Sequence, residues 1–183
     1  MPVRHAMNSP VALRESAVLV PVFRNAAGEA TLVLVRRGDF GVHGGQLAFP
    51  GGKRDPTDAS LLATALRETE EEVGLPAAAI EVLAALPPIQ TRTSGFHIAP
   101  FLARVAPPPT WRFAQPEIAE VLEVPLPHLA DPANAGQELW AFPGQPVPEL
   151  ISFWRIGPHY LWGATHRMLQ PLLPRLLAGE WEI

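Results

Sequence analysis

Five charged side chains crowd into one short stretch of the chain, Arg67-Glu68-Thr69-Glu70-Glu71-Glu72. If the stretch is helical, a step of about 100° per residue puts Glu71 at about −60° and Glu72 at about +40° from Glu68. Three carboxylates then share one face and repel each other by roughly a few tenths of a kcal/mol per pair. Hard divalent cations with oxygen ligands, Mg²⁺ above all beside phosphates, would neutralise them. The alternative is a solvated acidic face without a ligand.

The surroundings of the acidic stretch favour the metal interpretation. Gly51 and Gly52 precede it after a short strand, and they let the backbone approach a metal ion or a phosphate closely. Gly74 is a helix-ending residue. In projection Arg67 lies next to Glu71 and is placed to hold it. The core-facing stripe, at about 100° to 160° on the same scale, consists of Leu62, Leu66, Thr69 and Val73.

The elements that must position these residues follow from apolar runs and from Pro and Gly punctuation. Thr57 or Asp58 is the expected cap of the acidic helix. The predicted helices are 59–73 and 161–177, with a helical turn at 127–130, and the predicted strands are 16–23, 31–36, 46–49, 80–86, 97–105, 121–124 and 150–154. Residues 131–149 are rich in Pro, Gly and Ala, so we expect them to be mobile. Mixed strands and helices, with a hairpin at the start, indicate an α/β (α+β) fold with a mixed sheet.

Composition limits the class of protein further. The chain has 183 residues, 48% of them hydrophobic and 17% charged, which suits one globular domain over residues 15–183 after a flexible N-terminal arm at 1–14. A net charge of −4 disfavours a nucleic-acid partner. There is no cysteine, which excludes disulfides and thiolate metal sites. We find no membrane-spanning run and no secretion signal, so a cytoplasmic protein is the expectation.

On these residues the sequence resembles the Nudix hydrolases, whose box has the form G-x5-E-x7-R-E-U-x-E-E-x-G-U with U apolar. Arg67, Glu68, Glu71, Glu72, Gly74 and Leu75 match in place, and Thr69 stands at the first apolar position. Upstream the pattern departs from the box. Asp58 takes the place of the first Glu, and eight residues rather than seven separate it from Arg67. The resemblance implies an α/β/α sandwich.

A second resemblance, to the coenzyme A diphosphatase branch, rests on the segment before the box. Gly45-Gln46-Leu47-Ala48-Phe49-Pro50-Gly51-Gly52 matches the branch ending G-Q-x-x-F-P-G-G. The segment between Arg37 and Gly45 is one residue short and lacks the internal Arg of the branch pattern. Two later segments, residues 117–126 and 161–165, are also similar.

By resemblance, two or three Mg²⁺ ions, or Mn²⁺ in their place, would bridge the carboxylates and a diphosphate and activate a water. The implied metal ligands are Glu68, Glu71, Glu72 and the Gly51 carbonyl, and the implied catalytic groups are Arg67, Glu71 and Glu72. For a general base, Glu117 and Glu120 are the candidates, although either can be an ordinary solvated residue. The candidate substrate-binding residues are Arg37, Phe40, His43 and Lys53.

Three functions remain open on the sequence. The first is hydrolysis of coenzyme A or its acyl derivatives to 3′,5′-ADP and phosphopantetheine. The second is the same chemistry on ADP-ribose, NADH or another nucleoside diphosphate derivative. The third is a binding module of this fold without turnover. Each implies a small-molecule nucleotide-diphosphate partner and a protein that is a monomer or a homodimer.

Overall fold

The computed structural model describes residues 14–41, 43–91, 95–108 and 110–183. Within these residues the larger sheet comprises β1 (Arg14–Arg24), β2 (Ala30–Arg37), β3 (Leu47–Ala48), β4 (Gly51–Lys53), β5 (Ile80–Ala85), β6 (Ile89–Gln90), β7 (Phe96–Val105) and β8 (Ile118–Pro125). The smaller sheet comprises β9 (Ala135–Trp140), β10 (Glu149–Ile156) and β11 (His159–Leu161). The α-helices are α1 (Leu61–Val73), α2 (Leu126–Ala130) and α3 (Gly163–Leu177), with 3₁₀ turns at Ala77–Ala79 and Pro132–Asn134.

The larger sheet is mixed, as the sequence predicted. Strands β1 and β2 form the expected antiparallel hairpin, with Val22 opposite Leu32. In contrast, β1 runs parallel to β7, from Arg14 beside Phe96 onward. The short strand β4 pairs antiparallel with β1 and places Gly51 opposite Val18. This last pairing fixes the glycine pair against the centre of the sheet.

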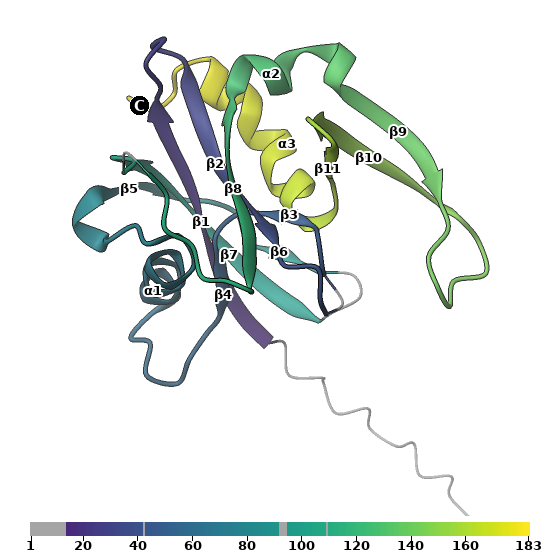
Figure 1. Cartoon of the computed structure of the whole chain (residues 1–183), viewed down its shortest axis with the longest axis horizontal. Helices are drawn as coiled ribbons and strands as arrows, with labels where there is room; N and C mark the ends of the chain where they lie inside the picture. The colour runs from purple at the N-terminus through teal and green to yellow at the C-terminus, as the bar shows by residue number, and fades with distance from the viewer. Residues whose placement is uncertain (1–13, 42, 92–94, 109) are drawn as a thin grey trace, which may run out of the picture.

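Alternating side chains of β1 and β2 fill two separate cores, one on each face of the sheet. Leu19 and Val33 belong to the core that also contains Val73 of α1. Val20 and Leu32 belong to the core that α3 covers on the opposite face. Helix, sheet and helix therefore form the α/β/α sandwich that Figure 1 shows, with α1 and α3 on opposite sides of the strands.

Helix α1 begins and ends at residues with clear local reasons. Ser60 has extended backbone and its side chain accepts a hydrogen bond from the Ala63 amide at 3.1 Å. The prediction of Thr57 or Asp58 as the cap was therefore wrong, because Asp58 uses its carboxylate elsewhere. At the other end Gly74 adopts φ of 69°, and its amide donates to the Glu70 carbonyl.

Other predicted boundaries also need correction. The segment 131–149 was expected to be mobile, yet it contains β9, which pairs with β10. Gly51 and Gly52 were expected to end a strand, whereas they begin β4. Arg14 was assigned to the flexible arm and instead opens β1, while the rest of that arm lies outside the described residues. Among the described helices, none is long and apolar enough to cross a membrane.

Candidate active site

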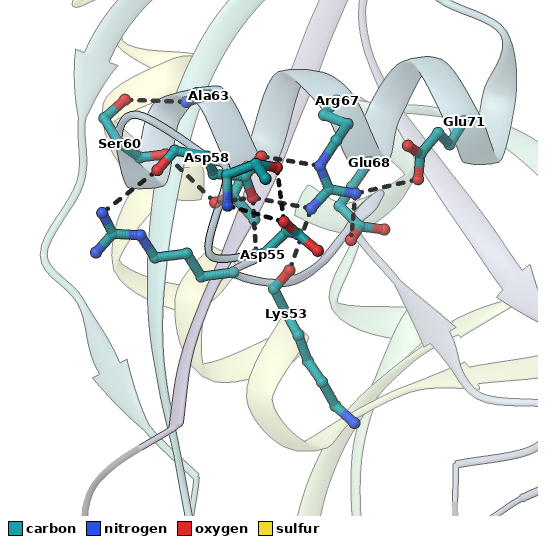
Figure 2. A network of polar contacts seen from close by, with 11 residues as sticks. Lys53, Asp55, Asp58, Ser60, Ala63, Arg67, Glu68 and Glu71 are labelled. Atoms are coloured by element: carbon teal, nitrogen blue, oxygen red, sulfur yellow. Dashed lines mark hydrogen bonds and ion pairs between the residues drawn. The ribbon is translucent and has the colours of Figure 1, made fainter.

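Arg67 is the central residue of the polar network at the start of α1. Its Nη1 donates to Glu68 Oε1 at 2.9 Å and to Glu71 Oε2 at 3.1 Å. Its Nη2 donates to the Lys53 carbonyl at 3.3 Å, which ties the helix to β4. Figure 2 shows the guanidinium between the glutamates of the helix and the loop that precedes it. One arginine thus fixes two of the carboxylates that the sequence singled out.

Asp58 holds Arg67 from the other side. Its two carboxylate oxygens accept from Arg67 Nε and Nη2, both at 2.9 Å, in a bidentate pair. It also accepts from the Thr64 hydroxyl at 2.8 Å and from the Asp55 amide at 2.9 Å. The Arg67 guanidinium, followed by the Asp55 amide, holds the pKa of Asp58 well below its usual range. The sequence left the role of Asp58 open, because Asp58 replaces the first Glu of the Nudix box and is separated from Arg67 by eight residues instead of seven.

Glu72 lies in a contrasting environment on the same helix. The residue is only 3% exposed, and one carboxylate oxygen accepts from the Gly51 amide at 2.9 Å. Burial raises the pKa of Glu72 to about 7, although the Gly51 amide and the nearby Arg37 partly oppose it. The sequence placed this carboxylate beside the core-facing stripe, and the structure buries it more completely than that.

Glu68 approaches Gly52 so closely that a larger residue at this position would displace its carboxylate. A Cβ on Gly52 would lie 2.4 Å from the carboxyl carbon of Glu68. Burial raises the pKa of Glu68, and Arg67 partly opposes the shift. A Cβ on Gly51 would lie 2.3 Å from the Ala17 carbonyl, where β4 packs on β1. The two glycines therefore bring the backbone close to the buried Glu72 and the partly buried Glu68.

The three glutamates have the donor chemistry of a divalent metal site. Among the described residues, no three Asp, Glu or His side chains yet converge as a ready set of ligands. Arg67 holds Glu68 and the more exposed Glu71, whereas the Gly51 amide holds Glu72. Burial raises the pKa values of Glu68 and Glu72, so their negative charges are poorly solvated at this site. Oxygen donors short of positive charge fit a hard divalent cation once the side chains reorient.

The two candidate bases lie in different surroundings. Glu117 immediately precedes β8, and its charge adds to the raised pKa values of Glu68 and Glu72, so it lies near them. Glu120 lies within β8, which is longer than predicted. Its carboxylate is 3.6 Å from Arg36 Nε and 3.4 Å from His159 Nε2. The structure brings only Glu117 towards the glutamates of α1.

The candidate substrate residues divide in the same way. Arg37 is close enough to Glu72 to lower its pKa. The Lys53 ammonium instead lies 5.7 Å from the ring centroid of Phe96, and Figure 2 shows its side chain leaving the carboxylate network. Phe40, 59% exposed, and His43 lie in the exposed loop between β2 and β3.

Lys53 lines a cavity of about 480 Å³ beside the carboxylate network. Its wall consists of Arg14, Glu15, Lys53, Arg54, Asp55, Pro56 and Phe96. The Arg14 guanidinium carbon lies 4.6 Å from the Phe96 ring centroid, so two cations flank one aromatic ring. The sequence did not single out Arg14 or Phe96, since they meet only through the parallel pairing of β1 and β7.

Comparison with known proteins agrees with this fold. The family model of the NUDIX domain matches residues 13–144. NudL of Salmonella paratyphi B, described as an uncharacterized Nudix hydrolase, is 45% identical over 114 residues, or 62% of this chain. That match covers 58% of the length of NudL, so the chain spans little more than half of this relative.

Two solved structures share the fold at lower identity. A MutT/nudix family protein from Enterococcus faecalis superposes with a TM-score of 0.61 at 17% identity, covering 95% of this chain and 66% of that one. The NUDIX domain of Shewanella oneidensis NrtR, solved with ADP ribose, gives 0.51 at 20% identity, covering 65% and 77%. The chain belongs to the Nudix family. Enzymes of this family generally use divalent metal ions, typically Mg²⁺.

Proposed function

We propose that this chain is a Mg²⁺-dependent diphosphatase that cleaves coenzyme A or its acyl derivatives to 3′,5′-ADP and phosphopantetheine. The observation that carries the chemistry is the buried Glu72 and the partly buried Glu68, packed against Gly51 and Gly52. The substrate class rests on the resemblance of the segment Gly45–Gly52 to the coenzyme A branch. The charge of the metal offsets the burial of these groups.

In this proposal Glu68, Glu71 and Glu72 hold the metal together with the Gly51 carbonyl. When bound, Mg²⁺, or Mn²⁺ in its place, neutralises charge on the diphosphate and lowers the pKa of a water. Arg67 positions Glu68 and Glu71 through the contacts described above. Asp58 keeps Arg67 in place, so the bidentate pair acts on the glutamates indirectly.

Glu117 is the proposed proton acceptor. In support of this role, the charge of Glu117 contributes to the raised pKa values of both Glu68 and Glu72. Glu120 is assigned to a structural ion pair with Arg36 rather than to proton transfer. A Glu117→Gln change is therefore expected to lower kcat, while Glu120→Gln leaves it within about twofold.

Substrate phosphates are assigned to two cationic positions. Arg37 is the cation that Glu72 senses, so it faces the pocket where the diphosphate would lie. Lys53 lines the neighbouring cavity with Arg14, and this cavity suits a further phosphate group of the substrate. His43 and Phe40, on the exposed loop, are assigned to contacts with the remainder of the substrate.

The experiment that tests the proposal is mass spectrometry of products from coenzyme A, acetyl-coenzyme A and 3′-dephospho-coenzyme A with Mg²⁺. We expect 3′,5′-ADP and the matching phosphopantetheine from the first two, with a higher KM for the dephospho form. Glu72→Gln should lower kcat by at least about a hundredfold with an unchanged circular dichroism spectrum. The matched control is Glu70→Gln, an exposed glutamate on the same helix, which should retain activity. No cleavage of any coenzyme A form would reject the substrate, and full activity of Glu72→Gln would reject the site.

A second candidate keeps the same chemistry on ADP-ribose or NADH. The observation in its favour is the missing Arg of the coenzyme A pattern, together with the ADP ribose bound to the NrtR domain. Parallel kcat/KM values for ADP-ribose, NADH and coenzyme A rank the two enzymatic proposals. Nucleotide binding by calorimetry without turnover of any of them would instead identify a non-catalytic module.

A further inference from the structure

Glu117 lies in a short backbone turn that leads into β8 and is tied to helix α1. The Ile118 amide donates to the Ala114 carbonyl at 2.8 Å, which closes the turn over residues 114–118. The Ala114 amide in turn donates to the Glu72 carbonyl at 3.0 Å, in the last turn of α1. The backbone of Glu72 therefore anchors the turn that carries Glu117, while the carboxylate of Glu72 points to Gly51.

The other anchor of this turn is the end of β2. The register of β2 with β8 shifts between Arg36 and Arg37, so β8 carries one extra residue at this point, a β-bulge. Bulges change the direction in which the following side chains point. This bulge separates Glu120, which lies opposite Arg36, from Glu117. Beyond the bulge the Gly38 amide donates to the Glu117 carbonyl at 2.7 Å, so the backbone of Glu117 is fixed directly by Gly38.

Gly38 is packed so tightly on this turn that a side chain has no room. A Cβ on Gly38 would lie 2.1 Å from the Pro116 carbonyl oxygen and 2.7 Å from Cε1 of Phe40. The Phe40 side chain is exposed and can rotate away, whereas the Pro116 oxygen belongs to the backbone of the turn. Gly38 is not one of the glycines with a positive φ, so space rather than backbone conformation requires glycine here. Any larger residue must push away the turn that carries Glu117.

We propose that Gly38 is a positioning residue for Glu117. Its missing side chain lets β2 close on the turn 114–118, and the turn is then clamped between Gly38 and the Glu72 carbonyl. The inference rests on the proposed function, in which Glu117 is the proton acceptor. A proton acceptor works only within hydrogen-bonding distance of the proton that it removes. A displacement of about 1 Å can cost on the order of a hundredfold in rate.

The first test is Gly38→Ala, assayed on whichever of coenzyme A and ADP-ribose is cleaved. We expect kcat to fall at least about tenfold, KM to stay within about threefold, and the circular dichroism spectrum to be unchanged. The competing explanation is a movement of the neighbouring Arg37, which would raise KM instead. The matched control is Asp39→Asn in the same loop, where an exposed carboxylate pairs with Arg36. This variant should keep kcat within about twofold of the wild type.

The second test repeats Gly38→Ala in a Glu117→Gln background. If Gly38 acts through Glu117, the alanine should change kcat by no more than about twofold there, because the group that it displaces is already inactive. Equal losses in both backgrounds would overturn the role of Gly38 and leave the proposed function standing. Full kcat in the Glu117→Gln single variant would instead reject the proton acceptor of the proposed function, and the role of Gly38 with it.

Amide hydrogen exchange gives a measurement that does not depend on turnover. In the wild type the amides of Gly38, Ala114 and Ile118 donate the bonds described above, so each should exchange at least about tenfold more slowly than in an unfolded peptide. In Gly38→Ala the amides of Ala114 and Ile118 should exchange faster, while that of Thr64, at the other end of α1, should not change. Unprotected amides in the wild type would overturn the proposal even if Gly38→Ala failed to fold. Unaltered exchange of both amides in a folded Gly38→Ala chain would overturn it as well.

Discussion

At the scale of single residues, two carboxylates near α1 respond to opposite environments. Asp58 has a full bidentate partner in Arg67, and its pKa is well below the usual range. Glu72 has only the Gly51 amide as a direct partner, and burial raises its pKa to about 7. Asp58 therefore holds Arg67 in position, whereas the buried Glu72 carboxylate is bonded to a backbone amide rather than to a cation.

The positioning role of Asp58 can be tested without changing any of the proposed metal ligands. Asp58→Asn removes the charge that pairs with Arg67, so the guanidinium should shift further towards Glu68 and Glu71 and compete with a metal ion for them. We expect Mg²⁺ affinity or kcat to fall about 10–100-fold. Glu81→Gln is the control, since it breaks an exposed ion pair with Arg104 outside the network. Unchanged Mg²⁺ dependence in Asp58→Asn would contradict the positioning role.

Glu72 predicts a pH-dependent stability in metal-free protein. Its pKa is about 7 in the folded chain against an ordinary value of 4.5, so the folded state binds more protons between these values. Stability should therefore fall as pH rises from about 4.5 to about 7. Each tenfold difference in proton affinity is about 1.4 kcal/mol, so the total effect is on the order of 3 kcal/mol. The lowered pKa of Asp58 acts in the opposite direction, but only below its ordinary value of 3.8.

Urea denaturation in EDTA between pH 5 and 8 measures this effect. The wild type should lose unfolding free energy across the range, whereas Glu72→Gln should show a shallower slope and greater stability at pH 8. Added Mg²⁺ should stabilise the wild type more at pH 8 than at pH 5, because protons compete for the same oxygens. A wild-type stability that rises with pH across this range would show that Glu72 is not the group responsible.

At the scale of elements, β4 is important because two of its three residues are glycines, which let its backbone approach the carboxylates of α1. Gly52→Ala should move the Glu68 carboxylate, which a Cβ would meet at 2.4 Å, while the backbone of β4 accommodates alanine. We expect kcat to fall at least about tenfold with a small change in unfolding free energy. The control is the same change in a Glu68→Gln background, where it should cost much less activity. Equal losses in both backgrounds would mean that Gly52 does not act through Glu68.

The same element shows what sequence could and could not predict. Helical spacing placed Glu68, Glu71 and Glu72 on one face, and β1 and β2 followed from their apolar runs. The β4 pairing with β1 was missed because Gly-Gly is also a turn signal, and only contacts 33 to 37 residues apart in sequence make it a strand. Likewise β9 is polar and glycine-containing, so its strand character depends on β10.

Only the features of the site that depend on residue spacing within one helix could be predicted from the sequence. The carboxylate face follows from α1 alone, whereas Glu72 is buried because β4 covers it. Glu117 and Glu120 were indistinguishable in sequence, and the pairing of β8 with β2 separates them by setting Glu120 opposite Arg36. Arg14 meets Phe96 only across the parallel strands.

At the scale of the whole molecule, two sheets share one core. Trp154 and Leu161 of the smaller sheet pack in the same cluster as Leu169 of α3 and Val20 and Leu32 of the larger sheet. Because the two sheets share this apolar cluster, the smaller sheet should not stay folded without the larger one. The single domain over residues 15–183 stays a prediction, and the shared cluster is its physical basis.

Cooperative unfolding tests that prediction. Tryptophans 140, 154 and 162 report on the smaller sheet, whereas Trp111 packs against the cluster on the α1 side. In Trp111→Phe, fluorescence should therefore follow chiefly the smaller sheet, and far-ultraviolet circular dichroism should follow the whole chain. We expect both urea transitions to coincide at one midpoint, measured at low protein concentration so that association does not contribute. An earlier fluorescence transition would contradict the prediction. It would mean that the smaller sheet unfolds while the larger sheet and α1 stay folded. Trp154 would then have left its cluster while Leu19 and Val33, on the other face of the larger sheet, remained packed.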